Sequence, residues 1–429
     1  MTTHDRELAI LAAALMFVAH PGEVAQTRDA VGPARLEAAG GGQERAGGRP
    51  DRIVPSTPGN VTWGDFPADK APVVVVRSGQ TVRIDTLSHA GATQGAAQGE
   101  APGNEMNHPV AYLAQFGVKP DEVLPDVVDF WKSGPSRPRP GRGGHILTGP
   151  VYIEGAEPGD MLEVQMLELS TRVPYGINNA GPTTGVLGAE YAGKAGPFYS
   201  GALGEHYPGR LSTTAPEIPP FGPVGNRNLI RTGRAGGREV AFFSNDITVP
   251  LAPFMGVMAV APANLVLGQP GVTVAGVQSS TPPGAFGGNM DVKDLKAGST
   301  LYLPVFHPGA LFYAGDPHSA QGDGEVSGTA IEQSLTGTFR FVVHKGRRIA
   351  GPRAEDATHY ILMGIDLDLD RALRLAVQEV VNFLVAEKGL TPGYAYSLAS
   401  VAVDFHVAEA VDQTQIVTGK IPKAIFRGR

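Results

Sequence analysis

The sequence predicts a mainly β fold, with a β-sandwich or jelly-roll-like core of stacked hairpins and a C-terminal αα-hairpin. Glycine and proline are frequent, with 57 and 36 copies, and only 18% of the residues are charged. This composition favours many turns between short strands over long helices. An apolar fraction of 42% in 429 residues is enough for a packed core.

Two local patterns predict the strands. The β-branched run Val73 to Val76 lies between a proline and a glycine, as expected for a short buried strand. A glycine turn followed by alternating residues occurs three times: Gly79 to Ile84, Gly159 to Val164 and Gly298 to Leu303. The repetition indicates stacked hairpins.

The C-terminal region, from about residue 366, predicts two helices. Asp370 is the expected N-cap of the first helix and Gly389 its C-cap. Thr391 and Pro392 are typical of the start of a second helix. One face of the first helix is predicted to be buried through Leu373, Val377, Val380 and Leu384. We expect the pair to cover a sheet or to form an oligomer contact.

Residues 1–52 are predicted to be a leader or flexible extension, and residues 53–429 a single folded domain. The extension is rich in Gly, Ala, Arg and Glu, and its hydrophobic residues do not recur at the spacing of a helix or a strand. Its apolar run, Leu8 to Ala19, has the length of a signal-peptide core, but the charge and cleavage patterns fit poorly. A cytoplasmic location is slightly favoured, and export to the periplasm is the alternative.

Charge and cysteine content exclude several functions. The net charge of −7 argues against a surface built for nucleic acid or anionic lipid, so a small-molecule partner is expected. No apolar run approaches the roughly 20 residues needed to span a bilayer. With no cysteine, the chain has no thiolate metal ligand and no thiol nucleophile.

The segment from Gly287 to Glu332 is the richest in candidate metal ligands. Small residues separate five oxygen or imidazole donors: Asp291, Asp316, His318, Asp323 and Glu325. Such spacing lets several side chains converge on one divalent ion. The segment does not fit an EF-hand loop. When the loop is counted from Asp316, His318 and Ala320 occupy positions that require acidic or amide ligands.

Other histidines are weaker candidates. His145 follows a glycine pair and precedes a predicted strand, so it is a metal ligand, a proton shuttle or a satisfied histidine at a strand edge. His89 and His108 flank a loop long enough to form the rim of a pocket.

The sequence lacks the motifs of other hydrolytic mechanisms. The chain has no G-x-S-x-G elbow, no H-E-x-x-H helix and no P-loop. Ser279 and Ser280 lack the glycine and lysine arrangement of serine amidases. Metal-assisted hydrolysis is therefore the favoured route.

Several separated phrases resemble the acetamidase/formamidase family, in order, from about Ile53 to the end of the chain. They are Thr148 to Asp160, Pro253 to Met258 with Ala261-Pro262, Gly287 to Asp291, Gln321 to Glu325, Gly328 to Glu332, and Ala395 to Val401. The resemblance implies a mainly β sandwich with helical additions, hydrolysis of the carbon–nitrogen bond of linear amides, and a homo-oligomer. Phe286 and Ser327 depart from the family, which often has a polar residue and a cysteine at these positions.

The predicted activity is therefore cleavage of a small linear amide, of the formamide or acetamide type, to a carboxylate and ammonia by metal-activated water. The site assignment follows from the donor types: Asp291, His318 and Asp323 as metal ligands, Glu325 as general acid and base, Asn289 as a donor to the substrate, and His145 as a catalytic or reserve ligand. Zinc is the favoured ion and calcium the alternative.

Two other functions fit the same residues. One is a non-catalytic β-sandwich binding protein whose acidic loops hold a structural Ca²⁺ ion. The other is a hydrolase of the same family acting on a larger or cyclic amide, for which the aromatic Phe286 would change the wall of the pocket.

Overall fold

The computed structural model describes residues 49–93, 107–134, 139–180, 185–186 and 226–426. The run Leu8 to Ala19 and nearly all of the predicted extension lie outside these residues. The first strand begins at Arg52, one residue before the predicted start of the folded domain. No helix in the described part of the chain is both long and apolar enough to cross a membrane.

The largest sheet has nine strands in the order β1-β4-β15-β6-β13-β16-β17-β19-β18. Three of its strands follow the glycine turns predicted from the sequence. Gly79, Gly159 and Gly298 have φ angles of 91°, 94° and 90°, and β4, β6 and β13 begin two residues later. The bounds are β1 (Arg52–Val54), β4 (Thr81–Asp85), β6 (Met161–Thr171), β13 (Thr300–Pro304), β15 (Leu335–His344), β16 (Arg353–Glu355), β17 (His359–Asp366), β18 (Asp404–Glu409) and β19 (Gln415–Pro422).

A second sheet has the order β12-β11-β14-β5-β2, with β3 paired in parallel to β5. Its strands are β2 (Val61–Trp63), β3 (Val74–Arg77), β5 (Ile146–Glu154), β11 (Phe254–Val260), β12 (Gly287–Asn289) and β14 (Phe312–His318). The predicted buried run at 73–76 is only half correct: Val76 is buried, whereas Val75 is 46% exposed. β3 pairs only with β5, and along it Val76 is buried while its neighbours Val75 and Arg77 are exposed.

A four-stranded sheet, β10-β9-β8-β7, completes the β structure. It consists of β7 (Tyr175–Ala180), β8 (Asn226–Ala235), β9 (Arg238–Phe242) and β10 (Thr248–Pro250). An isolated bridge joins Ile177 of β7 to Glu332, which connects this sheet to the segment after β14.

The main hydrophobic core lies between the two larger sheets, which confirms the predicted sandwich. Leu162 of β6 and Phe341 of β15 belong to the same buried cluster as Val257 of β11 and Phe312 of β14. As a result, β11 and β14 are buried at every position. A polar side chain on β14 must therefore find its partners inside the protein.

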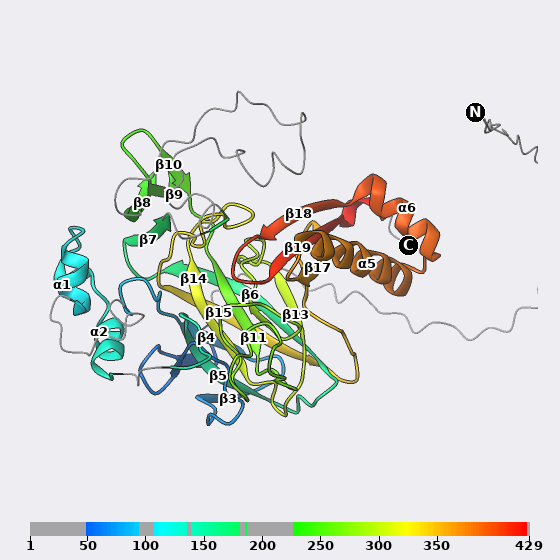
Figure 1. Cartoon of the computed structure of the whole chain (residues 1–429), viewed down its shortest axis with the longest axis horizontal. Helices are drawn as coiled ribbons and strands as arrows, with labels where there is room; N and C mark the ends of the chain where they lie inside the picture. Colours follow the sequence, from blue (N-terminus) through cyan, green and yellow to red (C-terminus); the bar gives the residue numbers. More distant parts are fainter. Residues whose placement is uncertain (1–48, 94–106, 135–138, 181–184, 187–225, 427–429) are drawn as a thin grey trace, which may run out of the picture. The chain divides into compact units, whose positions relative to one another are not determined.

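The C-terminal helices α5 (Leu369–Lys388) and α6 (Pro392–Ala402) form the predicted αα-hairpin, and α5 packs on β17 and β19 (Figure 1). Gly389 ends α5 in the left-handed conformation, as predicted. The N-cap is Asp368 rather than Asp370, and its side chain accepts from the Arg371 N–H. Thr391 precedes α6 without a capping side-chain bond.

The sequence did not predict the early helices. These are α1 (Pro109–Ala114), α2 (Pro125–Lys132) and the short turn η2 (Pro120–Glu122), and a further turn, η3 (Lys423–Ile425), follows β19. His108 caps α1 through its Nδ1, and its ring contacts Trp131. A structural role therefore accounts for this histidine.

The buried face of α5 differs from the predicted one by one residue in its first half. Ala372 and Ala376 face the sheet, together with the predicted Val380 and Leu384, whereas Leu373 is 42% exposed. The helix lies so close to the sheet here that a Cβ on Gly364 of β17 would clash with the backbone of Ala372 and Ala376.

This geometry gives a matched pair of stability predictions. Leu384→Ala should lower the free energy of unfolding by about 2–5 kcal/mol, because it leaves a cavity under α5. Leu373→Ala should change it by less than about 0.5 kcal/mol. Urea unfolding of both variants beside the wild type measures the difference, and equal losses would contradict the observed helix face.

Candidate active site

A cluster of histidines and carboxylates lies at the end of β14. Asp316 and His318 are on this strand, His145 immediately precedes β5, and β5 pairs with β14 through Leu147 and Gly315. His89 follows β4 a few residues after its end. The strand pairing therefore brings together side chains that are far apart in the sequence.

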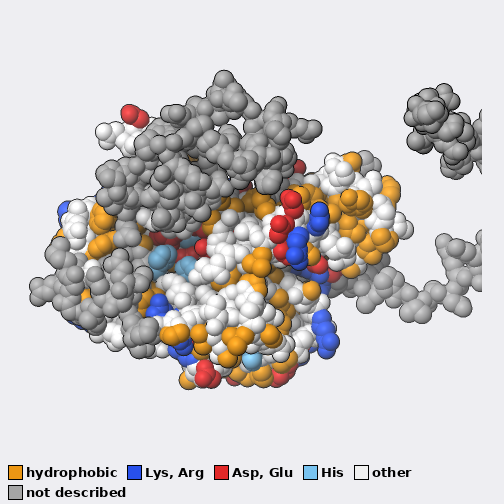
Figure 2. All heavy atoms as spheres, viewed as in Figure 1, with side chains coloured by type: hydrophobic (Ala, Val, Ile, Leu, Met, Phe, Trp, Pro, Cys, Tyr) orange, Lys and Arg blue, Asp and Glu red, His pale blue; other side chains and the backbone are white. Residues whose placement is uncertain are grey.

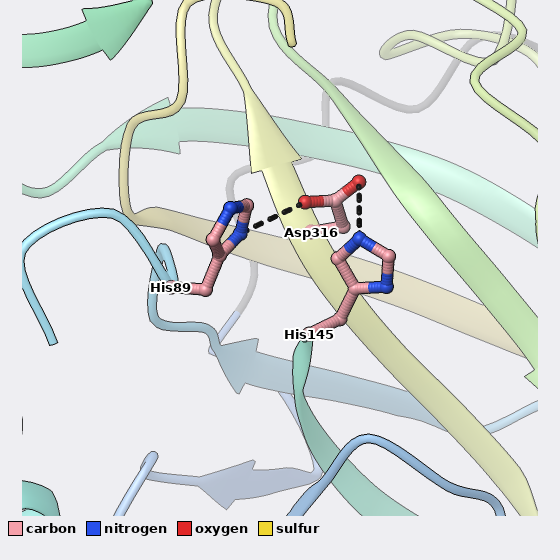
Figure 3. A group of neighbouring side chains, drawn as sticks. All are labelled: His89, His145 and Asp316. Atoms are coloured by element: carbon pink, nitrogen blue, oxygen red, sulfur yellow. Dashed lines mark ion pairs between the residues drawn. The ribbon is translucent and has the colours of Figure 1, made fainter. Parts of the chain in front are cut away.

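The first donor group consists of His89, His145 and Asp316 (Figure 3). His89 Nδ1 is 3.6 Å from Asp316 Oδ1, and His145 Nε2 is 3.8 Å from Asp316 Oδ2. His145 Nδ1 lies 3.1 Å from the Ser280 carbonyl oxygen and 3.0 Å from its hydroxyl. Because the carbonyl only accepts, this contact places a proton on Nδ1 and leaves Nε2 facing Asp316.

A second group surrounds His318. Its Nε2 is 3.2 Å from Asp316 Oδ2, 3.1 Å from Glu332 Oε1 and 3.9 Å from Glu325 Oε1. Its Nδ1 is 3.0 Å from Gln321 Oε1, while Gln321 Nε2 donates to the Asp291 carbonyl at 2.7 Å. The glutamine orientation is thus fixed, and its oxygen accepts the Nδ1 proton of His318.

A third group joins Asp291 to Glu409 and Asp412, whose carboxylate oxygens lie within 4.8 Å of one another. Asn289 Nδ2 donates to Asp412 Oδ2. Asp412 belongs to the connection between β18 and β19, so this group links the last two strands to the segment after β12.

The backbone at the cluster adopts an unusual conformation. Asp291, Asp316 and Glu325 have φ angles of 47°, 48° and 43°, a left-handed region that costs non-glycine residues free energy. Gly256 of β11 supplies the room that two of these carboxylates need. A Cβ there would lie 2.3 Å from Asp291 Oδ1 and 2.7 Å from Asp316 Oδ2.

Burial and the repulsion between neighbouring carboxylates raise the pKa values of several carboxyl groups. Burial raises the pKa of Asp291 well above its usual value, and the nearby charges of Asp316 and Asp412 add to the shift. The pKa values of Glu325 and Glu409 rise well above normal for the same two reasons. That of Asp412 is raised to about 6, again mainly by burial.

The pKa values of Asp316 and His318, both on β14, shift in the direction that favours the charged form of each. Burial opposes ionisation of Asp316, but the charges of His145 and His318 outweigh it and hold its pKa well below the usual range. Burial also disfavours the charged form of His318, but Glu332 and Asp316 raise its pKa well above normal. The cluster therefore attracts positive charge.

Three of the residues predicted from the sequence come together. Asp291, His318 and Glu325 place donor atoms within 4.8 Å of one another, so the predicted convergence of the 291 and 316–325 segments is confirmed. His145 lies in the neighbouring group, next to Asp316. Asn289 is fully buried beside Asp412.

Asp323 is not brought to the cluster. Its carboxylate lies 2.8 Å from Lys293 Nζ and 3.7 Å from His406 Nδ1, with the side chain 31% exposed. In the described part of the chain it belongs to none of the groups that can hold a metal. It is therefore left out of the ligand set proposed below.

Sequence reasoning missed four residues of the cluster. His89 was considered only for a pocket rim, although its position after a predicted strand was a usable signal. Glu332 ends a segment that carries the family resemblance. Glu409 and Asp412 had no local signal, because they lie more than a hundred residues from Asp291 in the sequence and only the tertiary structure brings them to it.

A pocket of about 590 Å³ has Gln321, Glu325 and Ile331 in its wall, and Glu325 is the member of the cluster that it reaches, whereas His89, His145 and Asp316 are not in its lining. Phe286 is not part of this wall, because it packs on Phe66 in the main core. Figure 2 shows histidine side chains next to acidic ones at the surface of the face drawn there.

The sequence profile of the acetamidase/formamidase family matches residues 141–428, which is more than half of the chain. The chain belongs to the acetamidase/formamidase family. Among curated members, it is 30% identical over 208 residues to an acetamidase of Mycolicibacterium smegmatis and 27% identical over 205 residues to a formamidase of Methylophilus methylotrophus. Each match covers 43% of this chain, and 49% and 47% of the two relatives, so the chain spans about half their length.

Solved structures of family members share the fold. The crystal structure of an acetamidase from Bacillus halodurans is 24% identical, with a TM-score of 0.60, over 87% of this chain and 98% of that one. An acetamidase from Yersinia enterocolitica is also 24% identical, with a TM-score of 0.62, over 90% and 96% of the two chains. Identity at this level supports the fold alone.

Proposed function

We propose that this member of the family hydrolyses the carbon–nitrogen bond of a small linear amide, giving a carboxylate and ammonia, with a divalent metal ion as cofactor. The observation that carries the proposal is the buried group of histidines and carboxylates around Asp316. Relatives that share its family are named acetamidase and formamidase.

The donor geometry fits a metal ion. Donor atoms that share one ion at roughly 2.0–2.2 Å lie about 2.8–3.6 Å apart. The contacts of His318 Nε2 with Asp316 and Glu332, at 3.2 and 3.1 Å, fall in this range. The contact of His89 with Asp316, at 3.6 Å, is at its upper limit, and that of His145, at 3.8 Å, is slightly wider. Among the described residues, Asp316 Oδ1, His89 Nδ1 and His318 Nε2 are buried without a protein hydrogen bond.

His89, His145 and Asp316 are the proposed ligands. Two imidazoles and one carboxylate form a donor set that suits zinc and leaves a position for a reactant. The His89 side chain is 28% exposed, so small molecules can reach this group. Asp291 and His318, assigned from the sequence, form the alternative set with Glu325, and Asp316 forms a further group with His318 and Glu332.

The ion would supply Lewis acidity, which polarises the amide carbonyl and makes water a nucleophile near neutral pH. Glu325 is proposed to accept the proton of the attacking water and to pass it to the departing nitrogen. It lines the pocket, and its Oε1 is 3.9 Å from His318. Asn289 donates to Asp412, so we assign it the role of holding that carboxylate rather than the substrate.

A larger or cyclic amide is the second candidate substrate. The pocket volume of about 590 Å³ exceeds what formamide or acetamide needs and falls in the range of drug-sized ligand sites, roughly 300–1,000 Å³. The other alternative, a binding protein with a structural Ca²⁺ ion, has less support, because the accessible group contains two imidazole nitrogens.

We also propose that the chain assembles as a homo-oligomer. Large apolar side chains are exposed on the C-terminal helices, where Figure 2 shows hydrophobic atoms at the surface. They include Leu375 of α5 and Tyr394, Tyr396 and Val401 of α6, which are between 42% and 77% exposed. Exposed apolar patches of this kind mark protein–protein contacts.

Product release from a panel of amides tests the function. Formamide, acetamide, butyramide and a five-membered lactam should be compared before and after chelation, and after adding Zn²⁺ back. We expect turnover with at least one amide, loss on chelation and recovery with Zn²⁺. Hydrolysis that persists without metal would contradict the cofactor and favour Ser280, which contacts His145, as nucleophile. No hydrolysis of any amide would contradict the activity.

A further inference from the structure

We propose that the preferred substrates are linear monoamides of dicarboxylic acids, and that Lys296 binds the carboxylate at the far end of their acyl chain. The proposal rests on the amide hydrolysis proposed above and names its substrate class. Its basis is the pocket of about 590 Å³, whose lining contains both Glu325 and Lys296. A pocket of this volume holds a drug-sized ligand, so formamide and acetamide would leave most of it unfilled.

The two ends of the pocket differ in burial. Glu325 is 5% exposed, and its Oε1 lies 3.9 Å from His318 Nε2, which is itself 3.2 Å from Asp316 Oδ2. The pocket therefore ends close to the proposed metal ligand Asp316. Lys296 is exposed and lies at the outer end. A substrate with its amide group at Glu325 would direct its other end toward Lys296.

Strand pairing sets the separation of the two ends. Lys296 forms a bridge with Phe254 of β11, and Phe254 pairs on its other side with His318 of β14. Neighbouring strands are about 4.8 Å apart, so the backbones at Lys296 and His318 are separated by roughly 10 Å. The flexible stem of the lysine shortens the distance to its ammonium group. An acyl chain of about four to six carbons, which spans roughly 3.5–6 Å when extended, fits what remains.

The uncharged part of the lining is largely aliphatic. Val249 of β10, Ala320 and Ile331 line the pocket and pack in one hydrophobic cluster. Polar side chains of the lining are engaged with the protein: Asn178 Nδ2, for example, donates to the Thr329 carbonyl at 3.0 Å. These walls favour the methylene groups of an acyl chain over a polar group in the middle of the substrate.

Lys296 is the charged side chain of the lining that has no hydrogen bond or ion pair within the described part of the chain. Ion pairs engage its neighbours: Lys293 Nζ is 2.8 Å from Asp323 Oδ2, and Asp294 Oδ2 is 2.6 Å from Lys420 Nζ. The Lys296 ammonium group is therefore available to a ligand. A carboxylate would form a charge-assisted hydrogen bond with it, whereas a neutral end gains less and a cationic end is repelled.

Hydrolysis converts such a monoanion into a dicarboxylate. The hydroxide part of water joins the acyl carbon as the carbon–nitrogen bond breaks, and the nitrogen accepts the remaining proton and leaves as ammonia. The new carboxylic acid then ionises and gives its proton to ammonia. The far carboxylate takes no part in these steps, so Lys296 acts in substrate binding alone.

The kinetics of succinamate and succinamide test the proposal. The two molecules have the same length and differ at the far end, which is a carboxylate in succinamate and a neutral amide in succinamide. For the full chain loaded with Zn²⁺, kcat/KM per amide group should be about five- to tenfold higher for succinamate, through a lower KM. Because Lys296 is exposed, this preference should shrink as the NaCl concentration rises.

Three variants identify the source of the preference. Lys296→Met removes the charge and keeps an unbranched side chain, so the ratio of the two kcat/KM values should fall to about one. Lys296→Arg keeps a cation and should retain the preference. Lys132→Met is the matched control, because Lys132 is an exposed lysine of α2 outside the pocket lining, and it should leave the ratio at the wild-type value.

The outcomes separate this proposal from the amidase function. Hydrolysis of succinamide or acetamide without a preference for succinamate, or a preference that survives Lys296→Met, would overturn the proposal and leave the function standing. If no amide is hydrolysed, the function fails, and isothermal titration with succinamate tests the pocket directly. Weaker binding by Lys296→Met would then support the role of Lys296, and equal affinities would overturn it.

Discussion

Asp316→Asn is expected to abolish both metal retention and amide hydrolysis. Asp316 is the carboxylate of the proposed ligand set with His89 and His145, and it also lies 3.2 Å from His318 Nε2. A bound ion contributes several kcal/mol to such a reaction, and each 1.36 kcal/mol is tenfold in rate, so turnover should fall by about 10³-fold or more. Elemental analysis and ammonia release measure the two losses.

The fold of this variant should survive, because asparagine has nearly the same shape and removes a buried charge. Circular dichroism and thermal unfolding in the absence of metal provide the control. Full zinc content in Asp316→Asn would show that the ion binds elsewhere, and the ligand assignment would then be abandoned.

Glu325→Gln is expected to separate proton transfer from metal binding. If Glu325 moves the proton, the variant should keep its zinc and its KM but lose about 10²–10⁴ in kcat, the usual contribution of a positioned acid or base. Zinc content and steady-state kinetics on the same preparation test this result. An active variant, or one that loses zinc with its activity, would contradict the role.

Asp323→Asn is the matched control, because it lies two residues away in the same loop. Its carboxylate pairs with Lys293 and His406 outside the groups that can hold a metal, so the zinc content should stay within about twofold of the wild type. The sequence alone assigned Asp323 to the metal, and the structure places it elsewhere. The pair of variants therefore also decides between these two interpretations.

The strained backbone explains why these carboxylates are held so closely. Asp291, Asp316 and Glu325 all adopt positive φ, and the core of the sandwich fixes the strands around them. Gly256 leaves the space in which two of the carboxylates meet. Strain of this kind is found at functional sites, because the surrounding packing stabilises conformations that the isolated chain would avoid.

The sequence by itself determined the features that depend on neighbouring residues. Glycine turns located β4, β6 and β13, because a left-handed turn needs the residue that tolerates it. Gly389 located the end of α5 for the same reason. The donor-rich segment from Asp291 to Glu325 identified the region of the site, because few other segments combine acids, histidine and glycine so densely.

Only the tertiary structure decided which donors meet. His145 reaches Asp316 through the pairing of β5 with β14, and Glu409 of β18 lies beside Asp291, which follows β12 of another sheet, across separations of more than a hundred residues. Local patterns carry no information on such pairings, and a shift of one residue in strand register turns a side chain to the opposite face. The direction of Asp323 and the buried face of α5 were likewise decided by tertiary contacts, with Lys293 and His406 in the first case and with Gly364 of β17 in the second.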